Sequence, residues 1–234
     1  MEHNYGEIIA PTKQELFIRR IQGMILSEEL RPGDRLPPER ELAAEMKISK
    51  TLVHEGIREL ARLGFVDVLS GQGVIVADYS KTGNIDTLLS IMKYQEGHLD
   101  NRMAYSILDL RLETEAASLM TMARNRDSDE LRQLSDIVKK ARALPEEEYD
   151  DIIDLVVSFH HLVFSFSDNV VYPLVFNAFS AVTRRFWVEY TKRKGIPFVL
   201  DGLDSYVSCL KDGRGEDAVQ ILNDEIEWAK TTLY

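Results

Sequence analysis

The residues with the clearest chemical role open the segment SKTLVHEGIRELARLG, which starts at Ser49. On a helix over 49–63, turning about 100° per residue, Lys50, Thr51 and His54 share one side and the apolar residues take the other. A Lys there can donate to guanine or to phosphate, and a Thr can bond a phosphate or touch a thymine methyl. The Ser49 end also offers free backbone N–H groups to a phosphate. This spacing predicts a helix that contacts DNA.

Two flanking segments add to this polar set. Arg40 lies on the preceding helical stretch, where it can reach the DNA backbone or a base. The sequence Ser70-Gly71-Gln72-Gly73 is typical of a hairpin tip. Its glycines let the backbone approach DNA closely, while Ser70 and Gln72 supply hydrogen-bonding groups. We therefore expect Arg40, Ser70, Gly71 and Gln72 to join Ser49, Lys50, Thr51 and His54 in one DNA-binding surface.

Local signals indicate how the chain positions that surface. Thr12 and Glu15 form a capping-box pair that starts a helix, and this helix ends before the turn at 31–34. Pro37-Pro38 opens a second helix, which runs to about Met46, and Ser49 caps the third. Strands over 65–69 and 74–76 then enclose the hairpin tip. Residues 1–78 therefore predict a winged helix-turn-helix, with 79–84 as a linker.

The remaining chain, residues 85–234, shows helical periodicity to its end and predicts an all-α bundle. Segment 152–166 is apolar nearly all round, so we expect it to be buried. The fold class is thus mainly α, with a small β-hairpin wing in the first domain. The expected helices of the second domain are 84–95, 99–124, 127–143, 147–167, 171–192, 197–211 and 215–232.

Composition limits the alternatives. The net charge is −11, and residues 1–80 hold 10 Lys or Arg against 13 Asp or Glu. This balance argues against non-specific binding to nucleic acid by the whole surface, and a DNA reader must concentrate its positive charge locally. The chain has no apolar run of membrane-spanning length and no secretory-type start, so no membrane partner is expected. One cysteine, Cys209, fits a reducing cytoplasm.

The second domain holds a few polar residues in apolar surroundings. Arg111 lies on an apolar helix, and two interpretations stand: a pair with Glu115 or Asp109, or a fork that holds a ligand carboxylate or phosphate. His160 is either a core histidine with a backbone or water partner, or a donor to a ligand oxygen. His161 follows it directly, so the two imidazoles point about 100° apart on a helix.

The segments RPGDRLPPERELA, SKTLVHEGIRELARLGFV and GQGVIV, in this order, resemble the N-terminal domain of GntR-family bacterial transcription regulators. The resemblance covers residues 12–78. It implies that Arg40, Lys50, Thr51 and Gly71 contact DNA. His54 stands where the family usually has Arg, which removes a permanent bidentate donor and bears on the operator sequence.

The segments LDLRLETEAASLMTMA and FHHLVFSFSDN resemble the FadR-type effector domain of that family. The resemblance implies an effector site for which Arg111, His160, Asn169 and Arg185 are candidates, although Asn169 can equally cap the helix at 171. Many relatives bind a divalent metal through one Asp and three His. Here His160 alone matches, with Val156, Leu203 and Glu225 at the other positions, so no metal or other cofactor is expected. A carboxylate–histidine site of His160, Asp204 and Glu225 is the alternative.

These features predict a homodimeric transcription regulator on a palindromic operator, controlled by a small metabolite, either a carboxylate or an acyl thioester. Two other functions are considered. A metal-dependent enzyme on the bundle would need paired Glu-x-x-His motifs, which the sequence lacks. A protein-interaction adaptor would use the winged helix to bind protein, and salt-sensitive binding to a DNA palindrome would distinguish it.

Overall fold

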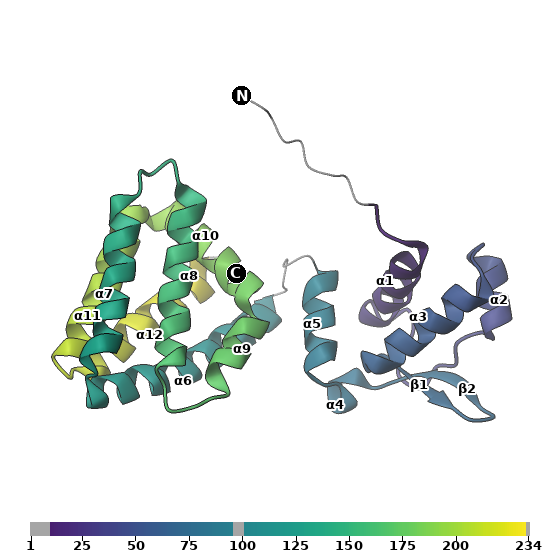
Figure 1. The fold of residues 1–234 in the computed structure, drawn as a ribbon. Helices are drawn as coiled ribbons and strands as arrows, with labels where there is room; N and C mark the ends of the chain where they lie inside the picture. Colours follow the sequence, from purple (N-terminus) through teal and green to yellow (C-terminus); the bar gives the residue numbers. More distant parts are fainter. Residues whose placement is uncertain (1–9, 96–100, 233–234) are drawn as a thin grey trace. The chain divides into compact units, whose positions relative to one another are not determined.

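Two capping side chains start the helices of the N-terminal unit at the predicted positions. The computed structural model describes residues 10–95 and 101–232 (Figure 1). Glu15 Oε2 accepts a 2.8 Å hydrogen bond from the Thr12 backbone N–H, and Thr12 Oγ1 accepts one from Glu15 N, which begins α1 (Lys13–Leu26). Ser49 Oγ accepts from Leu52 N at 3.2 Å and begins α3 (Lys50–Arg62). Each pair satisfies N–H groups that a first helical turn leaves open.

Among the first three helices, α3 contacts both of the others. Helix α2 (Glu39–Glu45) precedes it, and the connecting turn places Lys47 at a positive φ of 53°. On the buried side of α3, Gly56 leaves room for the ring of Phe17 from α1, and a Cβ at Gly56 would overlap that ring. Val53 and Leu60 are fully buried on the same side. The core of the unit thus contacts α3 on its apolar side, and the opposite side of the helix is exposed.

The hairpin follows α3 directly. Strands β1 (Val66–Leu69) and β2 (Gly73–Val76) are antiparallel, with Val66 opposite Val76 and Leu69 opposite Gly73. Arg35 adds a single antiparallel bridge to β2, so the segment before α2 lies along the hairpin. Together, α1, α2, α3 and the hairpin form the predicted winged helix-turn-helix.

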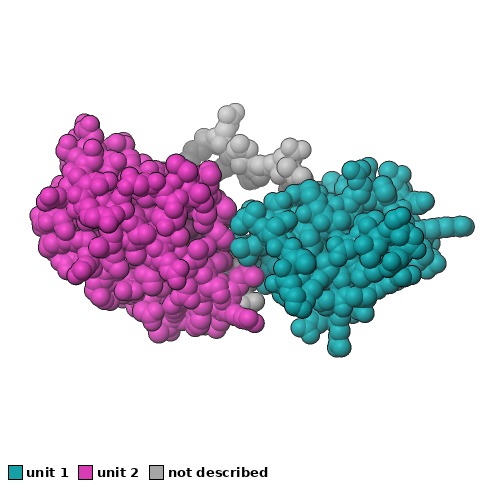
Figure 2. Space-filling model, turned by 90° about the horizontal axis from the view of Figure 1, so that it is seen from below, with its two compact units in different colours: residues 1–96 teal, residues 97–234 magenta. Residues whose placement is uncertain are grey.

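Two further helices follow the hairpin. Helix α4 (Tyr79–Thr82) lies within the predicted linker 79–84, and α5 (Ile85–Tyr94) matches the helix predicted for 84–95. The chain divides into two compact units at residues 96 and 97, whereas the predicted division was 79–84 (Figure 2). The reason is tertiary contact: Gln22 Nε2 of α1 donates to Ser90 Oγ at 3.0 Å, and Arg62 Nη1 of α3 donates to Asp86 at 2.7 Å. Helix α5 therefore packs with the N-terminal unit.

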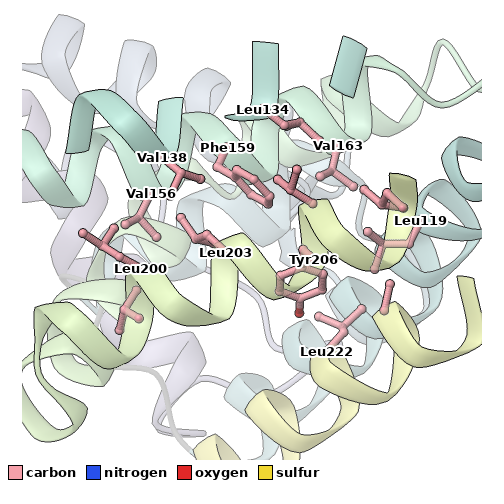
Figure 3. Packing of buried hydrophobic residues seen from close by; sticks show 14 of the residues in the cluster. Leu119, Leu134, Val138, Val156, Phe159, Val163, Leu200, Leu203, Tyr206 and Leu222 are labelled. Carbon is pink, nitrogen blue, oxygen red and sulfur yellow. The ribbon is translucent and has the colours of Figure 1, made fainter. Parts of the chain in front are cut away.

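The second unit is a helical bundle. Its helices are α6 (Asn101–Asn125), α7 (Ser128–Ala143), α8 (Tyr149–Ser165), α9 (Tyr172–Ala178), α10 (Ser180–Lys194), α11 (Ile196–Lys211) and α12 (Gly215–Thr232). Helix α6 runs along α12, and α7 packs against both α8 and α11 (Figure 1). Helix α8 is the buried apolar segment that the sequence predicts, with Val156 and Phe159 at 0% exposure (Figure 3).

One predicted helix is wrong in this unit. The segment 171–192 forms two helices, α9 and α10, which meet at Phe179 (φ −104°, ψ 8°). The segment after Pro173 holds no glycine or proline up to Lys194, so no local signal marks the break. The Phe179 side chain is buried, so we attribute the break between α9 and α10 to the packing of this ring. Within residues 10–95 and 101–232, no helix has both the length and the apolar character that crossing a bilayer requires.

Candidate DNA-reading surface and ligand pocket

The polar residues at the start of α3 form an exposed row. Ser49, Lys50, Thr51 and His54 are all exposed, while Val53 on the opposite side is fully buried. The first turn of α3 also presents backbone N–H groups that are not satisfied within the helix, and Ser49 Oγ takes that of Leu52. This end of α3 can therefore approach an anion such as a phosphate.

A side-chain contact links α3 to α2 beside this row. His54 Nδ1 lies 2.7 Å from Glu39 Oε1, and both side chains remain partly accessible to solvent. Arg40, the next residue of α2, is exposed. The predicted cation of α2 thus lies next to a carboxylate that faces the start of α3.

The hairpin tip is also exposed. Ser70, Gly71 and Gln72 all face solvent, and Gln72 N donates to Leu69 O at 3.1 Å to close the turn. Gly71 has a positive φ of 73°, and a Cβ built on it meets no atom within 4 Å. The tip can therefore approach another molecule along its backbone, which is the property that the sequence analysis assigns to it.

One cation of α3 has a structural role. Arg62 donates to both oxygens of Glu59 at 2.8 Å, and its Nη1 pairs with Asp86 on α5. It therefore holds the end of α3, whereas Arg58 on the same polar side is exposed. The positive charge available on the polar side of α3 comes from Lys50 and Arg58.

The second unit buries a cluster of ionisable groups around Arg111 of α6. Arg111 Nε donates to Glu115 Oε2 at 2.7 Å, and Arg111 Nη2 lies 3.4 Å from Glu225 Oε2 of α12. His160 Nδ1 of α8 lies 2.5 Å from the other Glu115 oxygen. Of the two interpretations of Arg111, the pair with Glu115 is therefore present, and Glu225 joins it.

Burial and charge set the protonation states of this cluster. Burial by itself would raise the pKa of Glu115, but Arg111 and His160 outweigh it and lower that pKa to about 2. Burial raises the pKa of Glu225 to about 8, with the Glu115 carboxylate adding to the rise and Arg111 opposing it. Burial also lowers the pKa of His160. At neutral pH the cluster thus holds one ion pair, a neutral imidazole and a largely protonated Glu225.

Aromatic rings enclose the cluster. The His160 imidazole stacks on the Trp187 indole, with centroids 4.7 Å apart and planes at 18°. The Arg111 guanidinium lies 5.1 Å from the ring centroids of both Phe186 and Trp187, a cation–π geometry. His160 is 0% exposed, as expected for a core histidine, and its partner is a carboxylate instead of backbone or water.

An apolar pocket adjoins Arg111. Helices α6, α9 and α10 form most of its wall, and Phe164 of α8 completes it. Arg111 is the only charged residue among the described residues that line it, and Thr114 and Thr183 are the polar ones. The full lining is Ala104, Ile107, Leu108, Leu110, Arg111, Thr114, Phe164, Val175, Phe176, Phe179, Val182, Thr183 and Phe186.

The other residues predicted for the effector or a metal lie elsewhere. Asn169 is exposed, and its Oδ1 accepts from Val171 N at 2.9 Å in the turn before α9, but the N-cap of α9 is Val171 and no side chain caps it, so Asn169 is not the helix cap that the sequence offered. Arg185 is partly buried on α10, outside the pocket lining. Asp204 is exposed and pairs with Arg142 at 2.7 Å, so it does not join His160 and Glu225. Among the described residues, no group of three acidic, His or Cys side chains could hold a metal ion.

The sequence analysis did not single out the aromatic wall. Phe164, Phe176 and Phe179 line the pocket, and the rings of Phe164 and Phe176 lie 5.1 Å apart. Their spacing is also that of an ordinary helical core, so periodicity gave no sign of a pocket. A clustering of aromatic residues over 159–187, seven Phe, Tyr and Trp residues after Phe159, is the signal that was present in the sequence.

Comparisons with known proteins agree with both parts of the structure. Residues 14–76 match the profile of "Bacterial regulatory proteins, gntR family", and residues 106–227 match the profile of the FCD domain. The chain is 32% identical to the HTH-type transcriptional regulator Mce2R of Mycobacterium tuberculosis over 170 residues, which are 72% of this chain and 68% of that protein.

Two further similarities extend this result. The Uxu operon transcriptional regulator of Escherichia coli is 31% identical over 128 residues, covering 55% of this chain and 45% of that protein. A solved structure of Lar from Listeria monocytogenes has a TM-score of 0.59 at 14% identity, and the match covers 96% of this chain and 97% of that one. At that identity the structure supports the fold alone.

Proposed function

The chain belongs to the GntR family of bacterial regulatory proteins and carries an FCD domain, and we propose from this that the start of α3 and the hairpin tip contact its operator. The chain is a DNA-binding transcriptional regulator and not an enzyme. Its FCD domain is an effector domain that binds a small metabolite. The residues, the assembly and the ligand chemistry below are our proposals.

The exposed row on α3 supports the proposal most directly. Ser49, Lys50 and Thr51 start a helix whose opposite side is buried, so α3 can enter a groove by its polar side and N-terminal end. The tip residues Ser70, Gly71 and Gln72 are exposed in the same unit and can follow the phosphate backbone. We assign base contacts to Lys50 and Thr51, and backbone contacts to the tip.

The negative net charge of the chain limits DNA binding to this one surface. The chain carries −11 overall, so binding depends on the few exposed cations of this surface, Arg40, Lys50 and Arg58. Each cation that neutralises a phosphate releases counterions, so affinity falls as salt rises. The acidic remainder disfavours DNA in any other orientation.

We further propose that two chains bind one operator. One chain supplies one α3, which covers a single half-site, and the two-fold symmetry of a homodimer would place two such helices on a palindrome. Because the proposed target is DNA, we propose a cytoplasmic location. The ligand would be a carboxylate or an acyl thioester that binds beside Arg111, with its binding energy shifting the spacing of the two α3 helices.

A double substitution tests the assignment on α3. The operator is first selected from random duplex DNA, and its affinity is then measured by gel shift at fixed salt. Lys50→Ala with Thr51→Ala removes both side chains from an exposed row, so folding stays intact while specific affinity falls by about 2–4 kcal/mol. Lys139→Ala, which removes an exposed cation of α7, serves as control. Unchanged affinity of the double variant would contradict the assignment.

A further inference from the structure

One face of the hairpin carries four valines. Val66 lies opposite Val76, and Val68 lies opposite Val74 in the antiparallel register. Side chains alternate between the two faces of a strand and directly opposed residues share a face, so all four point to the same side. Val66 and Val76 are buried, with exposed fractions of 1% and 2%, whereas Val68 is 58% exposed and Val74 is half-buried. This apolar stripe therefore begins in the core and continues, uncovered, toward the hairpin tip.

The hairpin has no cation to offer to DNA. Asp67 is the only ionisable residue between Phe65 and Val76, and the segment holds no Lys or Arg. Asp67 lies between Val66 and Val68 in the strand, so its side chain points to the opposite face. Ion pairs with phosphate therefore contribute nothing to DNA binding by the hairpin. Its affinity must come from hydrogen bonds at the tip and from burial of apolar surface.

The uncovered valines lie close to the tip. Val68 precedes Ser70 by two residues, which is about 7 Å along a strand that rises about 3.3 Å per residue. The minor groove of B-DNA is about 6 Å wide and about 7.5 Å deep. A tip that enters such a groove therefore brings Val68 and Val74 to its rim. The deoxyribose rings of the DNA backbone present C–H groups there, and these suit an apolar partner.

We propose that Val68 and Val74 pack against deoxyribose at the rim of the operator's minor groove, a contact that rests on the DNA-binding surface proposed above. Burial of apolar surface releases no counterions, so this part of the affinity does not follow the salt dependence of ion pairs. The chain carries a net charge of −11 and offers few exposed cations to DNA. The valine pair thus supplies affinity that the charge of the surface does not provide.

Salt titrations separate this contact from the ionic ones. The affinity of the full chain for its selected operator is measured between about 50 and 200 mM salt. Val68→Ala should weaken binding about fivefold at every salt concentration, because each buried methylene accounts for about fourfold in affinity and the burial is partial. The slope of log affinity against log salt should not change. Arg40→Ala, the ionic comparison, should reduce that slope by about 1. Unchanged affinity in Val68→Ala, or a slope reduced as in Arg40→Ala, overturns the proposal.

Two further variants exclude an effect on folding. Val68→Ile keeps the β-branched shape that suits a strand and adds one methylene, so it should tighten binding by about two- to fourfold. Leu16→Ala removes an apolar side chain of similar exposure, 52%, from α1. Leu16 lines a groove with Glu59 and Arg62 at the far end of α3, so its removal should leave operator affinity unchanged. Weaker binding by Val68→Ile, or equal losses in Leu16→Ala and Val68→Ala, contradicts the contact.

The same measurements distinguish this contact from the proposed function. If the wild-type chain binds its operator and Arg40→Ala weakens that binding, while Val68→Ala binds like the wild type, the valine contact fails and the DNA-binding surface stands. If the wild-type chain binds no duplex DNA specifically, the proposed function fails and the contact fails with it. Sedimentation equilibrium without DNA tests a second copy of the chain as the occupant of this face. A change of oligomeric state in Val68→Ala would place the valines against protein and overturn the proposal.

Discussion

His54 Nδ1 of α3 lies 2.7 Å from Glu39 Oε1 of α2, so an acidic side chain holds an imidazole on the very surface proposed to face DNA. The pair joins the two helices on either side of the turn at Lys47. It also places a negative charge next to Arg40 on α2 and in contact with α3, the helix that begins at Lys50. Surface pairs of this kind contribute little to stability, so its consequence is for DNA binding.

We expect Glu39→Gln to tighten operator binding. The substitution removes one negative charge near the phosphates and releases His54 from its partner, at a cost to stability of under about 1 kcal/mol. Gel-shift titration at fixed salt should show a gain of several-fold, which shrinks as salt rises. Glu146→Gln, an exposed acidic residue of the second unit, makes the same charge change and should have no such effect. Weaker binding by Glu39→Gln would mean that the pair positions His54 for contact.

Gly56→Ala should destabilise the N-terminal unit. Alanine normally stabilises a helix interior by up to about 1 kcal/mol relative to glycine. Here its Cβ would overlap the Phe17 ring, and we expect a net loss of about 1–3 kcal/mol. Hydrogen exchange of α1 and α3 amides measures this loss. Gly202→Ala on α11 is the matched control, since its Cβ meets nothing closer than Glu225 Oε1 at 4.0 Å. That change should be neutral or stabilising in the second unit.

Glu115→Gln should destabilise the bundle strongly. Glu115 is fully buried and is the ionised partner of Arg111, so the amide leaves a buried guanidinium without a full countercharge. Breaking such a pair costs about 3–5 kcal/mol. Urea unfolding followed by Trp187 and Trp228 fluorescence measures the second unit. Glu113→Gln, on the exposed side of the same helix, should unfold like the wild type. A loss below 1 kcal/mol would contradict the assigned ion pair.

Glu225 should make the stability of the bundle pH-dependent. Its folded pKa of about 8 lies above the ordinary 4.5, so the folded state binds the proton more tightly than the unfolded state does. This contribution is complete below about pH 4.5 and is lost as pH rises through about 8. Glu225→Gln resembles the protonated form and should flatten the dependence between pH 5.5 and 8.5. Urea unfolding of the two chains at both pH values measures the difference, and parallel curves would refute it.

Local signals in the sequence were sufficient for the N-terminal unit. The Thr12–Glu15 capping box and the Ser49 cap lie within three residues of the groups they satisfy, so both helix starts were predictable. The hairpin was equally local, because its glycines adopt positive φ values at the tip. All eight predicted DNA-contacting residues are exposed: helical periodicity accounts for Arg40, Lys50, Thr51 and His54, and the cap and turn positions account for Ser49, Ser70, Gly71 and Gln72.

Long-range contacts explain what the sequence did not reveal. Arg111 and Glu225 are 114 residues apart in the chain, and periodicity cannot pair them. The end of α9 at Phe179 depends on tertiary packing, since no glycine or proline marks it. The attachment of α5 to the first unit depends likewise on Ser90 and Asp86 meeting side chains of α1 and α3. Asn169 matched its family position, yet its side chain serves a local turn.

The contacts of Arg62 make α5 part of the N-terminal unit. Its guanidinium fastens the end of α3 to Asp86 of α5, and Gln22 fastens α1 to the same helix. Removal of α5 would therefore break side-chain contacts of both α1 and α3 within the N-terminal unit.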